Sequence, residues 1–231
     1  MLKHFFILIF MYGISISCGG KKTVAEPNIA PEKEVYINQN DEIALAGSVN
    51  FEDEEGLTIY TAILKNVTGD KAGAYIGHKM DKLANFLQQS GMSYAELLRA
   101  GEGLILEFNT KSDLYFDTGK TSLNSSSKDV LDRLIKALNE FSDVNVIIET
   151  HTDSSGDNEV NMKMTQDRLA SIESYLIDHG IDQSRVKSKA FGENQPKFKN
   201  DNATGRAKNR RVEFGFYASE SLKEEAKNKT D

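Results

Sequence analysis

The chain has 231 residues, of which 39% are hydrophobic and 27% charged, a composition typical of an ordinary globular protein. Its formal net charge of −7 argues against non-specific nucleic-acid binding, which needs a surplus of basic side chains to neutralise phosphates. Cys18 is the only cysteine, so the sequence excludes an intrachain disulfide.

The first residues predict a secretory signal peptide over residues 1–17, with a basic start at Lys3 and an apolar core over residues 5–16. That core is shorter than the roughly 20 apolar residues needed to cross a bilayer. The end of the leader resembles a bacterial lipobox, which implies cleavage before Cys18 and a diacylglycerol on its thiol. Such acylation would anchor the protein firmly to a membrane. A plain signal peptide with a leftover cysteine is the alternative.

The region before the main domain has two parts. Residues 18–40 are polar and predict a flexible tether, and residues 41–100 predict a small, partly helical region. Within that region, apolar spacing predicts a helix over about 75–89, and a capping-box pattern at 93–96 predicts another helix start. The four-residue spacing of Gly69, Gly73 and Gly77 would suit a helix-packing face. We expect instead that these glycines form a loop entering a helix.

Residues 101–217 alternate between strand and helix patterns. We expect strands over 103–108, 113–117, 144–148, 185–190 and 212–217, a helix capped by residues 124–127, and a longer helix over about 159–179. The β-α-β-α-β-β layout predicts an α/β (α+β) fold with a single mixed sheet and helices packed on one face. The charged residues 218–231 predict a frayed tail. No glycine-rich nucleotide-binding pattern is present in the sequence.

The strand over 144–148 leads through a polar turn into the helix that carries Arg168, with Asp153 just beyond the end of the strand. Packing of that helix on the sheet could bring this carboxylate and this guanidinium towards one cleft.

Several segments in this region resemble an OmpA-like domain, the periplasmic peptidoglycan-binding module. They are L-Y-F-D-T-G-K-T-S-L (114–123), T-D-S-S-G-D-N-E-V-N (152–161), M-T-Q-D-R-L-A (164–170), Y-L-I-D-H-G-I (175–181), F-G-E-N-Q-P (191–196) and N-A-T-G-R-A-K-N-R-R-V-E-F (202–214). The sequence departs from the family pattern at Thr150, where glycine is usual, and at Met164-Thr165, where Leu-Ser is usual.

The resemblance implies a ligand, the zwitterionic diaminopimelate side chain of the peptide stem. Asp153 would pair with its ammonium, and Arg168 would bind its carboxylate through two parallel N–H bonds. The family also implies polar contacts at five further positions: Asp117, Thr152, Asn161, Arg206 and Arg210. Each of these residues also has a purely structural interpretation, as a turn, a cap or a solvated side chain, and Arg211 is expected to brace the sheet.

No enzyme, cofactor or metal site is predicted. A strand extending through His151 and Asp153 would place both on one face, but two ligands are too few for zinc. The nearby acids lack the spacing of a calcium-binding loop, and no serine stands in a nucleophile-elbow pattern.

Leader, tether and resemblance together predict an outer-membrane lipoprotein, facing the periplasm, that links the envelope to the cell wall through peptidoglycan. The alternative is a Tol–Pal-like or secretion-system lipoprotein whose residues 41–100 dock envelope proteins. A flagellar stator subunit would need an uncleaved spanning helix with an acidic residue, which the leader does not provide.

Overall fold

The computed structural model describes residues 58–230, except 65–68, 93–94, 111 and 113. The predicted signal peptide, Cys18, the tether and residues 41–57 lie outside the described residues. Within the described part of the chain, no helix combines the length and apolar character that crossing a membrane requires.

A five-stranded sheet in the order β1-β2-β5-β3-β4 forms the centre of the described chain. Its strands are β1 (Glu96–Ala100), β2 (Gly103–Asn109), β3 (Val144–His151), β4 (Val186–Gly192) and β5 (Arg211–Ala218). β3 and β4 run parallel, whereas the other neighbouring pairs are antiparallel. The predicted single mixed sheet is therefore confirmed.

The main core lies on one face of this sheet. Alternate side chains of β2, β3 and β5 point into it, among them Leu104, Leu106, Phe108, Val146, Ile148, Phe214 and Phe216. Four helices cover this face: α3 (Lys71–Gln89), α4 (Ser125–Glu140), α5 (Asn158–Asp178) and α7 (Glu220–Thr230). The long helices thus pack on one face, as predicted.

A short helix, α2 (Ile59–Leu64), covers part of the opposite face. Its Ile59 and Ile63 form a separate small core with Ile105, Ile147 and Tyr217. Gly215 makes this close approach possible, because a Cβ there would lie 2.7 Å from the Ile59 side chain. The far face of the sheet is therefore buried where α2 crosses it.

Local signals correctly predicted three of the helices, α3, α4 and α5. Asn124 caps α4 by accepting a hydrogen bond from the Ser127 N–H (2.8 Å), and Asp157 caps α5 in the same way. α3 begins earlier than expected because Asp70 caps it at Gly73. Gly73 and Gly77 are consequently buried inside α3, so the loop interpretation of these glycines was wrong.

Two predicted elements differ because residues outside each element supply its hydrogen bonds. The capping-box pattern at 93–96 does not begin a helix: residues from Glu96 onward form β1, paired with β2. Residues 115–117 are not a strand, because the Ser127 hydroxyl takes both hydrogen-bonding groups of the Tyr115 backbone, its N–H (3.2 Å) and its carbonyl (2.7 Å).

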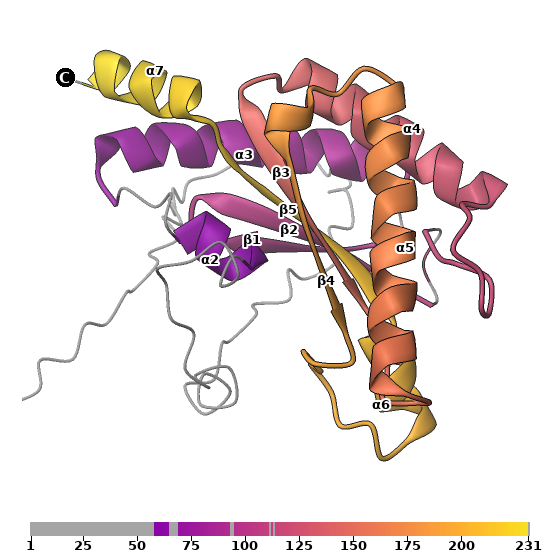
Figure 1. Cartoon of the computed structure of the whole chain (residues 1–231). Helices are drawn as coiled ribbons and strands as arrows, with labels where there is room; N and C mark the ends of the chain where they lie inside the picture. The colour runs from indigo at the N-terminus through magenta and orange to yellow at the C-terminus, as the bar shows by residue number, and fades with distance from the viewer. Residues whose placement is uncertain (1–57, 65–68, 93–94, 111, 113, 231) are drawn as a thin grey trace, which may run out of the picture. The chain divides into compact units, whose positions relative to one another are not determined.

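The C-terminal third of the chain holds two further helices that the sequence pattern did not predict. Residues 220–230, expected to fray, form α7, whose Leu222 and Ala226 are fully buried in the main core. α6 (Ala203–Asn209) precedes β5 and lies near the start of α5 (Figure 1).

Candidate functional site

The predicted site lies at the corner where β3 ends at His151 and α5 begins at Asn158. The Thr152 N–H donates to the carbonyl of Gly192 (2.7 Å), which ties the corner to the end of β4. The Thr152 hydroxyl is buried and has no hydrogen-bond partner among the described residues. We call residues 152–157, with the side chains that contact them, the β3–α5 corner.

Asp153 is buried in this corner, with 6% of its surface exposed. One carboxylate oxygen accepts the Ser155 N–H (2.8 Å), and the other pairs with the Arg210 guanidinium. Burial raises the pKa of the Asp153 carboxyl, but the hydrogen bonds from Arg210 and Ser155 outweigh it and hold the pKa below its usual value. Asp153 is therefore a fixed negative charge at neutral pH.

Asn161, in the first turn of α5, holds the corner in place. Its amide nitrogen donates to the backbone carbonyls of Asp153 (3.4 Å) and Ser155 (3.2 Å) and to the Glu193 carboxylate (2.6 Å). Because Asn161 is itself buried, these contacts fix the loop against the helix.

Arg206 and Arg210 reach the corner from α6 and the residue after it. Arg206 donates to the carbonyl of Asn200 (2.8 Å), and the Asn200 side chain accepts the Ser154 N–H (3.4 Å). Gly205 is required here, because a Cβ would lie 2.0 Å from the carbonyl oxygen of Lys199. The loop before α6 is thus folded tightly onto this helix, and of the two arginines Arg210 contacts the corner directly, through Asp153.

Arg168 contacts a different loop. Its Nε donates to the carbonyl of Lys120 (3.0 Å), and its guanidinium carbon lies 5.0 Å from the centre of the Phe116 ring. Burial lowers the pKa of this guanidinium, which nevertheless stays charged because its usual pKa is so high. No partner is found for its two terminal nitrogens within the part of the chain that the structure describes.

The structure therefore divides the predicted site residues into two groups. Four belong to the β3–α5 corner: Thr152, Asp153, Asn161 and Arg210. Arg206 contacts Asn200, whose side chain in turn contacts the corner at Ser154. Asp117 is exposed and lies in the 116–120 loop that Arg168 contacts. Asp153 pairs with Arg210, and among the described residues no contact joins it to Arg168.

The two groups are nevertheless neighbours on α5. Asn161, Thr165 and Arg168 follow at spacings of four and three residues, so they share one face of the helix. Two helical turns separate Asn161 from Arg168, about 10 Å along the axis. A helical side chain leans towards the N-terminus of its helix, which directs Arg168 back along this face towards the corner.

Sequence patterns missed the residues that support this site. Asn209 is fully buried and makes four hydrogen bonds to the loop before α6, through Lys197, Phe198 and Asn200. Glu193, Asn200 and Phe116 contact predicted site residues directly. The sequence pattern gave none of them a role, although Phe116, Glu193 and Asn209 lie in segments that resemble the family.

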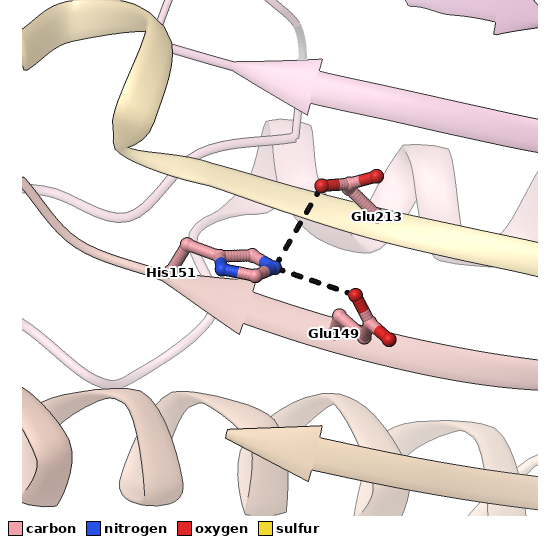
Figure 2. A group of neighbouring side chains, drawn as sticks. All are labelled: Glu149, His151 and Glu213. Carbon is pink, nitrogen blue, oxygen red and sulfur yellow. Dashed lines mark ion pairs between the residues drawn. The ribbon is translucent and has the colours of Figure 1, made fainter. Parts of the chain in front are cut away.

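The far face of the sheet carries a second group of ionisable side chains, which we call the far-face cluster: Glu107, Glu149, His151, Lys197, Arg211 and Glu213. Lys197 bridges Glu107 (2.9 Å) and Glu213 (2.8 Å), and Arg211 pairs with Glu213 (2.5 Å), so Arg211 braces the sheet as expected. His151 ends β3 facing Glu149 and Glu213 (Figure 2), not Asp153.

Burial and the neighbouring Glu213 raise the pKa of Glu149 to about 7, and the N–H of Ile59 donates to its carboxylate (2.5 Å). Burial lowers the pKa of His151, which leaves its imidazole neutral. Burial opposes the charge of Glu213 too, but Arg211 and Lys197 outweigh it and keep its pKa below the usual value.

Comparison with known proteins finds a family model that matches the region of the site. The model described as the OmpA family matches residues 115–210, which contain all seven predicted site residues. A solved structure, "The structure of the cell wall anchor of the T6SS from Pseudomonas aeruginosa", has a similar fold: the TM-score is 0.52 at 24% identity, covering 59% of this chain and 97% of that one.

Two curated relatives are similar over a longer stretch. The "Probable lipoprotein YiaD" of Escherichia coli (strain K12) is 32% identical over 146 residues, 62% of this chain and 64% of that protein. The "Peptidoglycan-associated lipoprotein" of Mesorhizobium japonicum is 25% identical over 139 residues, 60% of this chain and 83% of that protein. The matched part spans less than two thirds of the Escherichia coli protein.

Proposed function

Residues 115–210 form a domain of the OmpA family, and from this premise we propose that the protein binds peptidoglycan non-covalently through the diaminopimelate side chain of the peptide stem. The observation that supports this most is the position of Asp153 and Arg168, an acid in the loop that leads into α5 and a guanidinium on that helix. The name of the Mesorhizobium relative supports the same ligand.

The chemistry of the two groups suits a zwitterion. The Arg168 guanidinium is half-buried, packed on Phe116, and two of its nitrogens are available to grip a carboxylate in parallel. Asp153 offers a carboxylate that stays ionised, although Arg210 already contacts one oxygen. A ligand ammonium would therefore either bind Asp153 together with Arg210 or displace Arg210 from Asp153. The ligand carboxylate would offset the positive charge of the arginines that Asp153 does not neutralise.

Sedimentation with purified sacculi tests the assignment. We expect Asp153→Asn and Arg168→Ala each to reduce the fraction that co-sediments, and the double variant to abolish it. Lys136→Ala is the matched control, because Lys136 is exposed on α4 and its loss removes one positive charge away from the site. Circular dichroism confirms folding first. Wild-type retention of the folded double variant would show the site to be elsewhere.

For the cellular location, we propose an outer-membrane lipoprotein, anchored through an acylated Cys18 with the domain in the periplasm. The lipobox-like leader and the lipoprotein names of two relatives support it. Mass spectrometry of the mature N-terminus tests it directly: an acylated Cys18 is expected, and an unmodified or differently cleaved N-terminus would contradict it.

A further inference from the structure

His151 is a buried polar residue whose ring makes no hydrogen bond to the described residues. Only 3% of it is exposed, yet neither ring nitrogen has a hydrogen-bond partner among the described residues. The ring is held rigidly, stacked on Phe191 at a centroid distance of 5.1 Å and an angle of 7°. Buried polar atoms are almost always satisfied, so an exception calls for an atom that completes the site.

The environment of His151 indicates which kind of atom that is. Its Nε2 lies 3.6 Å from a Glu149 oxygen and 3.7 Å from a Glu213 oxygen, too far for hydrogen bonds. One donor atom from each of the three residues fits within 4.8 Å of the others (Figure 2). Ligand atoms around a tetrahedral zinc ion, bound at about 2.0–2.2 Å, lie roughly 3.3–3.6 Å apart.

The sheet itself sets this geometry. Glu149 and His151 are two residues apart on β3, so both point to the far face, and Glu149 stands directly opposite Glu213 on β5. The remaining oxygens are held in place: the other Glu149 oxygen accepts the Ile59 N–H (2.5 Å), and the other Glu213 oxygen accepts the Lys197 ammonium (2.8 Å). Such outer contacts orient carboxylate ligands at metal sites.

We propose that Glu149, the Nε2 of His151 and Glu213 bind a divalent transition-metal ion, with Zn²⁺ the best match to one imidazole and two carboxylates. The far-face cluster holds three carboxyl side chains, Glu107, Glu149 and Glu213, and two basic ones, Lys197 and Arg211. Because Arg211 also donates to the Glu213 oxygen that faces His151, its charge competes with the metal and lowers the affinity. The sequence-based expectation of no metal site missed this group because Glu213 is far from His151 along the chain.

Bound metal would fasten α2 to the sheet. The Ile59 N–H, at the start of α2, donates to Glu149, so a cation that fixes this carboxylate also fixes the contact. The site is separate from the proposed peptidoglycan contacts, which lie at the β3–α5 corner and along α5.

Metal titration of the full mature chain tests the proposal. After EDTA treatment and buffer exchange, calorimetry with Zn²⁺ should show one equivalent bound, and Co²⁺ should give the visible absorption bands of a protein-bound ion. We expect His151→Gln and Glu149→Gln to weaken Zn²⁺ binding by at least the roughly 10- to 100-fold that loss of an outer contact costs.

The matched control is the double variant His78→Gln with His179→Gln. Both histidines are exposed, so this variant removes their contribution to any Zn²⁺ binding at the surface. It should bind as the wild type does. Glu149→Gln serves as a second ligand variant in case His151→Gln does not fold. It should fold because it replaces a buried carboxyl group with a neutral side chain of similar size. Absence of binding by the wild type, undiminished binding by the folded ligand variants, or loss of binding in the control would each overturn the proposal.

Discussion

Arg168 combines two interactions that lysine cannot reproduce, a packed planar face and a fork of parallel donors. Its guanidinium lies over Phe116, and its Nε donates to the carbonyl of Lys120. The ligand carboxylate that we propose would bind its two terminal nitrogens, for which the described residues supply no partner. The charge alone would draw a carboxylate, but the orientation comes from this packing.

We therefore expect Arg168→Lys to weaken the binding of a soluble diaminopimelate-containing peptide by about tenfold or more, close to 1.4 kcal/mol, although it keeps the charge. Calorimetry with the purified chain measures this affinity. The control is Lys136→Arg, the reverse substitution at an exposed position away from the site. Affinity equal to wild type would mean that the positive charge is sufficient and that the fork makes no contact.

Individual elements of this protein were decided by different forces. Asn124 and Asp157 fix the starts of α4 and α5 through their own side chains, and the sequence pattern predicted the first of these caps. β1 was decided by its pairing with β2, which overrode the local capping pattern. α7 was decided by burial of Leu222 and Ala226, two apolar residues in an otherwise charged segment.

The contact of α7 with the core gives a prediction at this scale. Leu222→Ala should lower the free energy of unfolding by about 2–5 kcal/mol, because it empties a fully buried site. Lys227→Ala, on the exposed side of the same helix, should change it by less than about 0.5 kcal/mol. Urea denaturation separates the two, and equal stability of both variants would mean that α7 does not contribute to the core.

At the scale of the whole described fold, the two faces of the sheet differ in the side chains that they bury. One carries the apolar core beneath four helices, and the other carries α2 and the far-face cluster. Burying a carboxylate such as Glu149 beside Glu213 costs stability, and a stable fold tolerates such a cost mostly at sites that serve another purpose.

This cost makes stability depend on pH in the metal-free protein. The pKa of Glu149 rises from 4.5 to about 7 on folding, so the folded state holds this proton more tightly than the unfolded chain does. As pH rises from about 4.5 to 7, the unfolded state loses the proton first and stability falls, by roughly 2–4 kcal/mol in total.

Glu149→Gln removes this dependence. In EDTA, the difference in unfolding free energy between variant and wild type should shift in favour of the variant by that amount between pH 4.5 and 8. Taking the difference cancels the groups that titrate in both proteins. A difference that stays constant with pH would show that Glu149 is ionised throughout this range.

The sequence by itself determined most of the strand and helix periods of the central domain, the cap of α4, the mixed sheet and the family resemblance. These follow from side chains acting on their own neighbours in the chain, where spacing is visible. Only the tertiary structure decided that Asp153 meets Arg210, that Arg168 contacts the Lys120 loop, and that His151 faces Glu149 and Glu213. Those contacts depend on strand register and helix packing, which bring together residues that no local pattern connects.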